Sequence, residues 1–224
     1  MKTPFLRSAA GTDFYSVPVG NLNATAPFTA LAVLQPTGDP GGIFGGLDSG
    51  DGFELTVTTA SLITGTSGSV TSAQTAVTNL SQQAKIVFAA LAVPAAGNQT
   101  LFTNGSLTTD AIGLSAGGVA PRLLTAAASN SVNTGVAMLG YTNTAFTAAL
   151  LEGFYQDLQK NLNSGMLALA SLMQHAWLAF DNPTGRASSW VSRGTTGGLA
   201  ATPTFADANN PLITGDSITD ASWF

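Results

Sequence analysis

The stretch Ala84–Asp110 constrains the fold of this chain more than any other, because it joins a long apolar run to two turn signals. Its first part, Ile86–Val93, holds only apolar residues and is followed directly by Pro94. A short apolar run that ends in turn residues is typical of a strand buried on both faces. The next run, Thr100–Thr103, meets Asn104-Gly105, the dipeptide that most readily adopts the positive φ angles of a two-residue hairpin turn. This pattern predicts a buried strand, a reversal and a β-hairpin, so we expect an all-β chain.

The segment Leu101–Leu107, with the sequence LFTNGSL after a buried strand and a turn, resembles the central signature of the concanavalin A-like jelly rolls, which include the laminin-G-like domains. Segments similar to the early strands of this family, Gly42–Gly45 and Asp51–Val57, precede it, and segments similar to the late strands, Ala137–Gly140 and Leu151–Leu158, come after it. The family usually carries an aromatic residue and a histidine before the buried strand, whereas Gln82–Lys85 stands there in this chain. The resemblance covers residues 26–180 and implies a jelly-roll β-sandwich.

One amphipathic helix is predicted after the late strands. Apolar residues recur at helical spacing from Met166 to Phe180, Asn163 or Ser164 is placed to cap the start, and Asn182-Pro183 ends the run. We therefore expect an all-β jelly-roll (concanavalin-like) β-sandwich with one amphipathic helix and extended terminal arms. His175, the only histidine, is expected to be a partly exposed residue of that helix.

The two ends of the chain differ from its centre, because short apolar pieces and isolated aromatic residues stand there between polar, glycine-rich linkers. We predict an N-terminal arm over residues 1–25, a jelly-roll domain over 26–184 and an extended docking tail over 185–224. We expect that deleting the tail abolishes assembly and leaves the sandwich folded. Single aromatics of this kind suit insertion into pockets of a neighbouring subunit. The candidate docking residues are Phe14, Tyr15, Phe205, Trp223 and Phe224.

The charge content excludes some classes of partner. Charged residues make up 8% of the chain, against about a quarter in an average soluble protein, and the net charge is −5 with seven Lys and Arg residues in total. Neutralising phosphates needs clustered basic residues, so we expect no nucleic-acid partner. The longest apolar stretch, Gly165–Phe180, is shorter than the roughly 20 residues of a membrane span, so no membrane partner is expected.

The N-terminal sequence MKTPFLRSAAG lacks the apolar core of a secretory signal. Two routes out of the cell then remain open: release by lysis, as for a phage particle, or secretion without an N-terminal signal. The chain has no cysteine, which excludes disulfides, thiolate metal sites and a cysteine nucleophile.

No catalytic constellation is recognisable, so we expect that the protein is not an enzyme. Glycoside hydrolases need two carboxylates facing the scissile bond. Glu54 and Glu152 are the only glutamates, and neither begins the spacing that the glucanase branch of the family uses. Asp157 lies five residues after Glu152, and on an alternating strand the two would point to opposite faces. His175 has no nucleophile motif near it.

Two kinds of binding site are conceivable in a fold of this class. Loops at one rim of laminin-G-like domains bind calcium through aspartates, and the resemblance makes Asp39, Asp48 and Asp51 the candidate ligands for calcium, the one cofactor considered. Their glycine neighbours equally favour simple turn-forming aspartates. Glycan binding needs exposed aromatic rings, and the candidates are Tyr141, Tyr155 and Trp190. Each of these three rings is equally compatible with the core or with a subunit interface.

The leading hypothesis is a non-catalytic structural protein of a virion: a capsid decoration, tail or baseplate accessory protein of a tailed phage. It rests on low charge, the absence of cysteine and the docking character of the two ends. Expected partners are other virion proteins and further copies of the chain, as a homo-oligomer. The alternative is an extracellular lectin-like module that binds glycans on a host or another surface.

Overall fold

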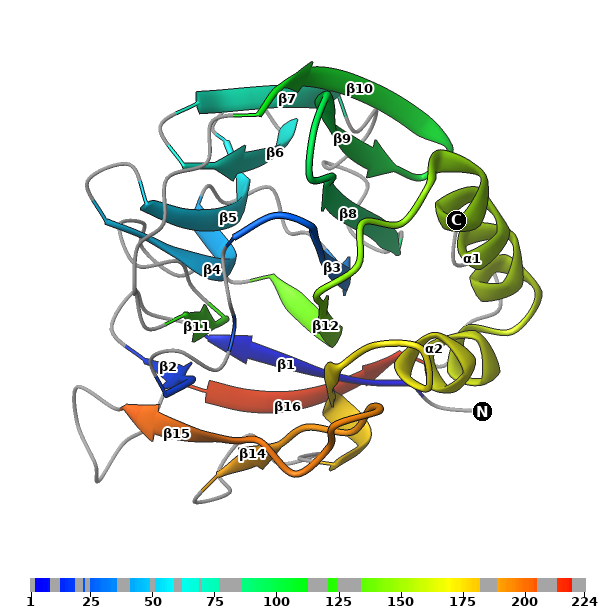
Figure 1. The fold of residues 1–224 in the computed structure, drawn as a ribbon. Helices are drawn as coiled ribbons and strands as arrows, with labels where there is room; N and C mark the ends of the chain where they lie inside the picture. The colour runs from blue at the N-terminus through cyan, green and yellow to red at the C-terminus, as the bar shows by residue number, and fades with distance from the viewer. Residues whose placement is uncertain are drawn as a thin grey trace.

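The fold is described by a computed structural model over residues 3–8, 13–18, 22, 25–35, 41–48, 51–58, 62–68, 70–76, 86–112, 121–124, 134–181, 189–204 and 213–218. Two antiparallel sheets of eight strands each face one another, and two helices cover the outer face of the first sheet (Figure 1). The protein is therefore a three-layered, mainly β sandwich. Within the described residues, no helix has the length and apolar character needed to cross a membrane.

The first sheet contains the strands predicted around the central hairpin. Its order is β10 (Ser106–Ala111), β9 (Asn98–Thr103), β8 (Val87–Val93), β3 (Phe28–Gln35), β12 (Gly135–Thr142), β1 (Thr3–Ser8) and β16 (Ile213–Ile218), and β13 (His175–Leu178) also pairs with β12. Asn104 and Gly105 both have positive φ, at 45° and 84°, as the hairpin turn between β9 and β10 requires. The Asn104 side chain also accepts a hydrogen bond from the Phe88 amide at 2.8 Å, which ties the turn to β8.

The second sheet forms the opposite layer of the sandwich. Its order is β14 (Trp190–Val191), β15 (Ala200–Thr204), β2 (Phe14–Ser16), β11 (Arg122–Leu123), β4 (Gly41–Asp48), β5 (Asp51–Val57), β6 (Leu62–Ser67) and β7 (Val70–Ala76). The hairpins β4–β5, β5–β6 and β6–β7 form a meander.

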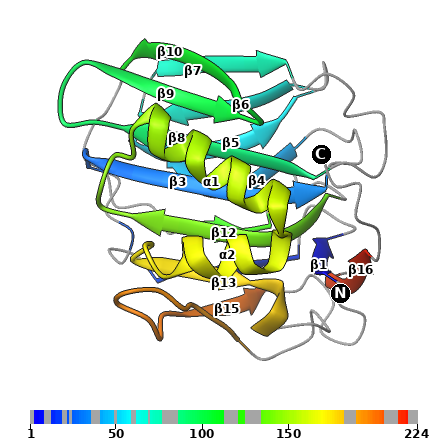
Figure 2. The same cartoon turned by 90° about the vertical axis from the view of Figure 1, so that its right-hand side faces the viewer.

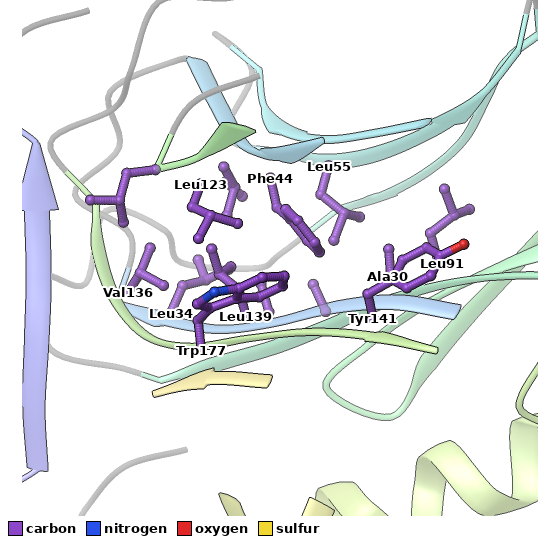
Figure 3. Close-up of a cluster of buried hydrophobic side chains, with 14 of the residues drawn as sticks. Ala30, Leu34, Phe44, Leu55, Leu91, Leu123, Val136, Leu139, Tyr141 and Trp177 are labelled. Atoms are coloured by element: carbon purple, nitrogen blue, oxygen red, sulfur yellow. The ribbon is translucent and has the colours of Figure 1, made fainter. Parts of the chain in front are cut away.

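Two apolar cores lie on the two faces of the first sheet. Along β3, Ala30, Ala32 and Leu34 point into the core between the sheets, whereas Leu31 and Val33 point to the helices. Figure 3 shows the inter-sheet core, where Phe44 of the second sheet lies over Trp177 of the first, with ring centroids 6.2 Å apart. A sheet covered on both faces needs apolar residues at successive positions, which explains the unbroken apolar run of β8.

The helices differ from the prediction in number and place. Residues 151–158, expected as a late strand, belong to α1 (Ala148–Lys160), and the expected long helix is shorter, as α2 (Leu162–Ala170). The residues after α2 form β13 and a short 3₁₀ helix, η1 (Ala179–Asp181). The prediction of one helix from Met166 to Phe180 was therefore wrong. Figure 2 shows both helices lying across the outer face of the first sheet.

Both ends of the chain contribute strands to the sheets. β1 pairs with β12 and β16, and β2 pairs with β11 and β15. β14, β15 and β16 all come from the segment expected as a docking tail. The described parts of the two terminal segments are thus built into the sandwich rather than extended from it.

Candidate functional site

Two of the three predicted glycan-binding rings lie in the core. Tyr141 is fully buried and its ring stacks on those of both Phe28 and Phe53, with centroid distances of 5.9 and 5.8 Å. Its hydroxyl donates to Asn143 Oδ1 at 2.9 Å, and burial raises the pKa of Tyr141. Trp190 is also fully buried. Neither ring presents a face to solvent, so neither can stack on a sugar.

In the core, Trp190 packs against Tyr15, one of the predicted docking residues. Its indole Nε1 donates to the Leu178 carbonyl at 2.9 Å, and its ring packs edge-on against Tyr15 at 5.5 Å. Tyr15 is fully buried and so cannot insert into a neighbour. Phe14 is half-buried beneath the Arg122 guanidinium, 4.3 Å from the ring centroid. Phe205, Trp223 and Phe224 lie outside the described residues.

The predicted calcium ligands are only partly placed. Asp48 and Asp51 are register partners at the end of the β4–β5 hairpin, but their side chains, like all of Asp39, lie outside the described residues. Among the residues that are described, no three His, Asp or Glu side chains gather closely enough to hold a metal ion.

His175 lies in a buried strand rather than on an exposed helix. It is 4% exposed, and burial lowers the pKa of the imidazole below its ordinary value. Its Nδ1 lies 3.3 Å from Ser192 Oγ, which accepts a hydrogen bond from the Leu199 amide at 3.1 Å. Ser192 is itself 4% exposed. A substrate has no access to this pair, which instead links β13 to the loop after β14.

Tyr155 is the predicted glycan residue that reaches the surface. It lies on α1 and is half-buried, and its ring packs edge-on against Phe102 of β9 at 6.1 Å. The tip of the β9–β10 hairpin lies beside the ring, because a Cβ built on Gly105 would be 3.5 Å from Tyr155 Cε1. Figure 1 shows α1 next to this end of the first sheet. The hairpin and the helix together fix the ring.

Polar groups surround the exposed part of this ring. Glu152 precedes Tyr155 by three residues, so both side chains lie on one face of α1. The Gln156 amide donates to Glu152 Oε1 at 3.1 Å. Burial raises the pKa of Tyr155, and the Glu152 carboxylate raises it further, so the phenol keeps its proton at neutral pH. The site thus offers a hydroxyl, an amide and a carboxylate.

An exposed aliphatic side chain completes the site. Leu107 of β10 is opposite Phe102 in the ladder and therefore shares its face, and it is 45% exposed. We call Glu152, Tyr155, Gln156, Gly105 and Leu107 the Tyr155 surface. Glu152 and Gln156 are not among the residues predicted for a site. Helical spacing of residues 152, 155 and 156 was the signal that would have found them.

Comparisons with known proteins bear on the fold. No protein-family model matches the sequence, and no curated protein matches it. Among solved structures, a native heptameric SAP-like pentraxin from Limulus polyphemus is 13% identical with a TM-score of 0.51, over 66% of this chain and 80% of that one. The binding domain of botulinum neurotoxin DC in complex with rat synaptotagmin II is 11% identical with a TM-score of 0.47, over 70% of this chain and 47% of that one.

A third structure, Trypanosoma rangeli sialidase in complex with sialic acid, is 11% identical with a TM-score of 0.46, over 59% of this chain and 23% of that one. The chain thus spans less than half of the toxin fragment and less than a quarter of the sialidase. At such identities the likeness concerns the fold alone.

These observations define the class of protein: a mainly β, antiparallel two-sheet sandwich with two short helices. Within that class, the chain has the concanavalin A-like fold, as the sequence predicted.

Proposed function

We propose that this protein is a non-catalytic, lectin-like module that binds surface glycans through the Tyr155 surface. The observation that carries the proposal is the half-exposed ring of Tyr155 with a carboxylate and an amide on the same helical face. The concanavalin A-like fold is compatible with this role, but one fold hosts many functions, so the residues of the Tyr155 surface carry the proposal.

The chemistry of the Tyr155 surface suits a sugar. One face of a pyranose ring carries C–H groups that pack on an aromatic ring, while its hydroxyls need hydrogen-bond partners. Glu152 accepts such bonds, and the Gln156 amide both donates and accepts. A few polar groups around an apolar surface fix the orientation of a ligand in this way.

Glycan-array screening followed by calorimetric titration of the best glycan tests the proposal. We expect Tyr155→Ala to weaken binding at least tenfold, because stacking on the ring is lost, and Tyr155→Phe to keep most of it. Glu152→Gln should weaken binding without loss of packing, since Glu152 is partly exposed. Leu150→Ala is the matched control, because Leu150 lies on the same helix and is 41% exposed.

Two results would contradict the proposal. One is a glycan that binds wild-type protein and all of these variants alike. The other is loss of binding in Leu150→Ala to the same degree as in Tyr155→Ala, with both variants folded by circular dichroism.

The assignment to a phage virion, drawn from composition and the character of the termini, stays a prediction. Immunogold labelling of purified particles is the measurement that tests it.

A further inference from the structure

A hollow of about 320 Å³ opens on the side of the molecule covered by α2, apart from the residues of the Tyr155 surface. It lies between the end of α2 and the loop that follows β14. Its lining residues are Leu167, Ala170, Ser171, Arg193, Gly194 and Thr195. This volume is at the low end for ligand pockets, roughly 300–1,000 Å³, so it suits a single sugar-sized molecule.

Arg193 is held in a fixed orientation at this hollow. Its Nε donates to Asp181 Oδ2 at 2.7 Å and one Nη2 hydrogen to Asp181 Oδ1 at 2.6 Å. The backbone of Arg193 forms a two-way bridge with Ala176, at 2.7 and 2.8 Å. A guanidinium held along one edge loses less conformational freedom when it binds a ligand.

The other edge of the same guanidinium is open. Arginine has five N–H donors, and the pair with Asp181 uses two of them. The remaining donors, on Nη1 and Nη2, have no partner among the residues that the structure describes, and the side chain is 55% exposed. Two parallel N–H groups on one edge match the two oxygens of a carboxylate.

The rest of the hollow provides acceptors and an aliphatic wall. Ser171 Oγ donates to the Ala168 carbonyl at 2.6 Å, and Thr195 Oγ1 donates to the Met173 carbonyl at 3.3 Å. Both hydroxyl oxygens therefore keep lone pairs that can accept hydrogen bonds from a ligand. Leu167, which is 46% exposed, supplies an apolar surface beside them.

Gly194 fixes the course of the loop at the hollow. Its φ of +113° favours glycine, and a Cβ there would lie 2.5 Å from the Met173 carbonyl oxygen and 2.7 Å from that of Gln174. The loop therefore packs closely against the chain after α2, which sets the positions of its neighbours Arg193 and Thr195.

We propose that this hollow binds a sugar that carries one carboxylate, of the uronic-acid type. The carboxylate pairs with the open edge of Arg193, ring hydroxyls donate to Ser171 and Thr195, and the C–H face of the ring packs on Leu167. Asp181 already balances the charge of Arg193, and its carboxylate repels a dianion such as hydrogen phosphate more strongly than a monoanion, so a single carboxylate is favoured over phosphate. The proposal uses no residue of the Tyr155 surface and does not depend on glycan binding there.

The test is a calorimetric titration of the full chain with glucuronate, glucose and inorganic phosphate, each at the same ionic strength. We expect saturable binding of glucuronate and at least tenfold weaker binding of glucose and phosphate. Arg193→Gln should abolish the preference for glucuronate over glucose. Arg193→Lys should weaken glucuronate binding severalfold, because an ammonium lacks the planar fork.

Two further variants make the test specific. Leu167→Asp places a negative charge at an exposed wall position and should reduce glucuronate binding at least tenfold while Arg193 stays in place. Lys160→Gln removes the same charge from another exposed pair, that with Asp157, and should leave binding unchanged. Equal affinity for glucuronate and glucose, unchanged binding in Arg193→Gln, or an equal loss in Lys160→Gln would each overturn the proposal. Loss of glycan binding in Tyr155→Ala with intact glucuronate binding would separate the two sites.

Discussion

At the scale of single residues, the second sheet depends on a glycine where two paired strands approach each other closely. Gly45 of β4 has a φ of +127°, and a Cβ there would lie 2.2 Å from the Phe53 carbonyl oxygen and 2.9 Å from Glu54 Cα. Both atoms belong to the backbone of the paired strand β5 and cannot move aside as a side chain would. The close approach of β4 to β5 therefore excludes every side chain at this position.

We expect Gly45→Ala to lower the free energy of unfolding by about 3 kcal/mol or more, since it combines backbone strain with a steric overlap. Urea denaturation monitored by circular dichroism measures the change. Gly153→Ala is the matched control, because no atom lies within 4 Å of the added Cβ and the residue is in α1. That variant should gain roughly 0.5–1 kcal/mol from helix propensity. A Gly45→Ala protein as stable as wild type would show that the two strands can separate locally.

At the scale of elements, one residue sets the boundary between the helices. Asn161 has extended backbone angles, with φ −157° and ψ 107°, and its amide donates to the Asp157 carbonyl at 3.1 Å to end α1. Its side chain accepts from the Ser164 amide at 3.0 Å and so caps the start of α2. Gly165 allows the two helices to touch, because a Cβ there would lie 2.9 Å from Leu158 Cα.

We expect Asn161→Ala to destabilise the protein by about 1 kcal/mol, the usual effect of losing an N-cap side chain. In a chain of this size that corresponds to a fall in Tm of roughly 2–4 °C. Thermal unfolding followed at 222 nm measures it, and Asn161→Asp should stay close to wild type because aspartate caps equally well. A fall in Asn161→Asp as large as that in Asn161→Ala would mean that packing, not capping, accounts for the effect.

The same elements explain which parts of the fold were predictable. The meander of β8, β9 and β10 was predicted from local signals alone, namely an apolar run and an Asn-Gly turn. Residues 151–158 were misassigned as a late strand on the resemblance, although Leu151, Phe154 and Leu158, the buried residues of α1, have helical spacing. β13 was missed because its strand character comes from pairing with β12, a contact distant in sequence.

The candidate site was predictable to a similar degree. An aromatic residue at 155 was identified, but its polar neighbours depended on the helical assignment. The exposure of a ring is set by tertiary packing, so Tyr141 and Tyr155 could not be distinguished without the structure. The hollow at Arg193 is formed by the end of α2 and the loop after β14, and Asp181 of η1 pairs with Arg193 there, a set of contacts that local sequence patterns do not bring together.

At the scale of the whole molecule, the first sheet is the middle of three layers. Along β8, Ala89 and Leu91 face the second sheet while Phe88 and Ala90 face the helices. Each face therefore depends on elements from distant parts of the chain. The C-terminal strands belong to this arrangement, since Trp190 and Ala201 are fully buried members of the inter-sheet core.

From this placement we expect the opposite of the earlier prediction that residues 185–224 can be deleted without loss of the sandwich. Truncation after residue 189 would remove β14, β15 and β16, expose the ring of Tyr15 that packs on Trp190, and leave β1 without one of its two neighbouring strands. Loss of a fully buried tryptophan side chain alone costs about 3–5 kcal/mol, a large part of the 5–15 kcal/mol that stabilises a typical protein.

We therefore expect the truncated protein to lose the near-ultraviolet circular dichroism of its packed aromatic rings and to unfold without a cooperative transition in urea. Trp190→Ala in the full-length chain is the companion variant. It keeps all three strands and should unfold cooperatively. Its denaturant midpoint should be lower, because its free energy of unfolding falls by about 3–5 kcal/mol. If the truncated protein instead unfolds cooperatively near the wild-type midpoint, the C-terminal strands are accessory, and the tail becomes available for docking as the sequence first suggested. If truncation abolishes the transition that Trp190→Ala preserves, the strands themselves, and not only the tryptophan, complete the sandwich.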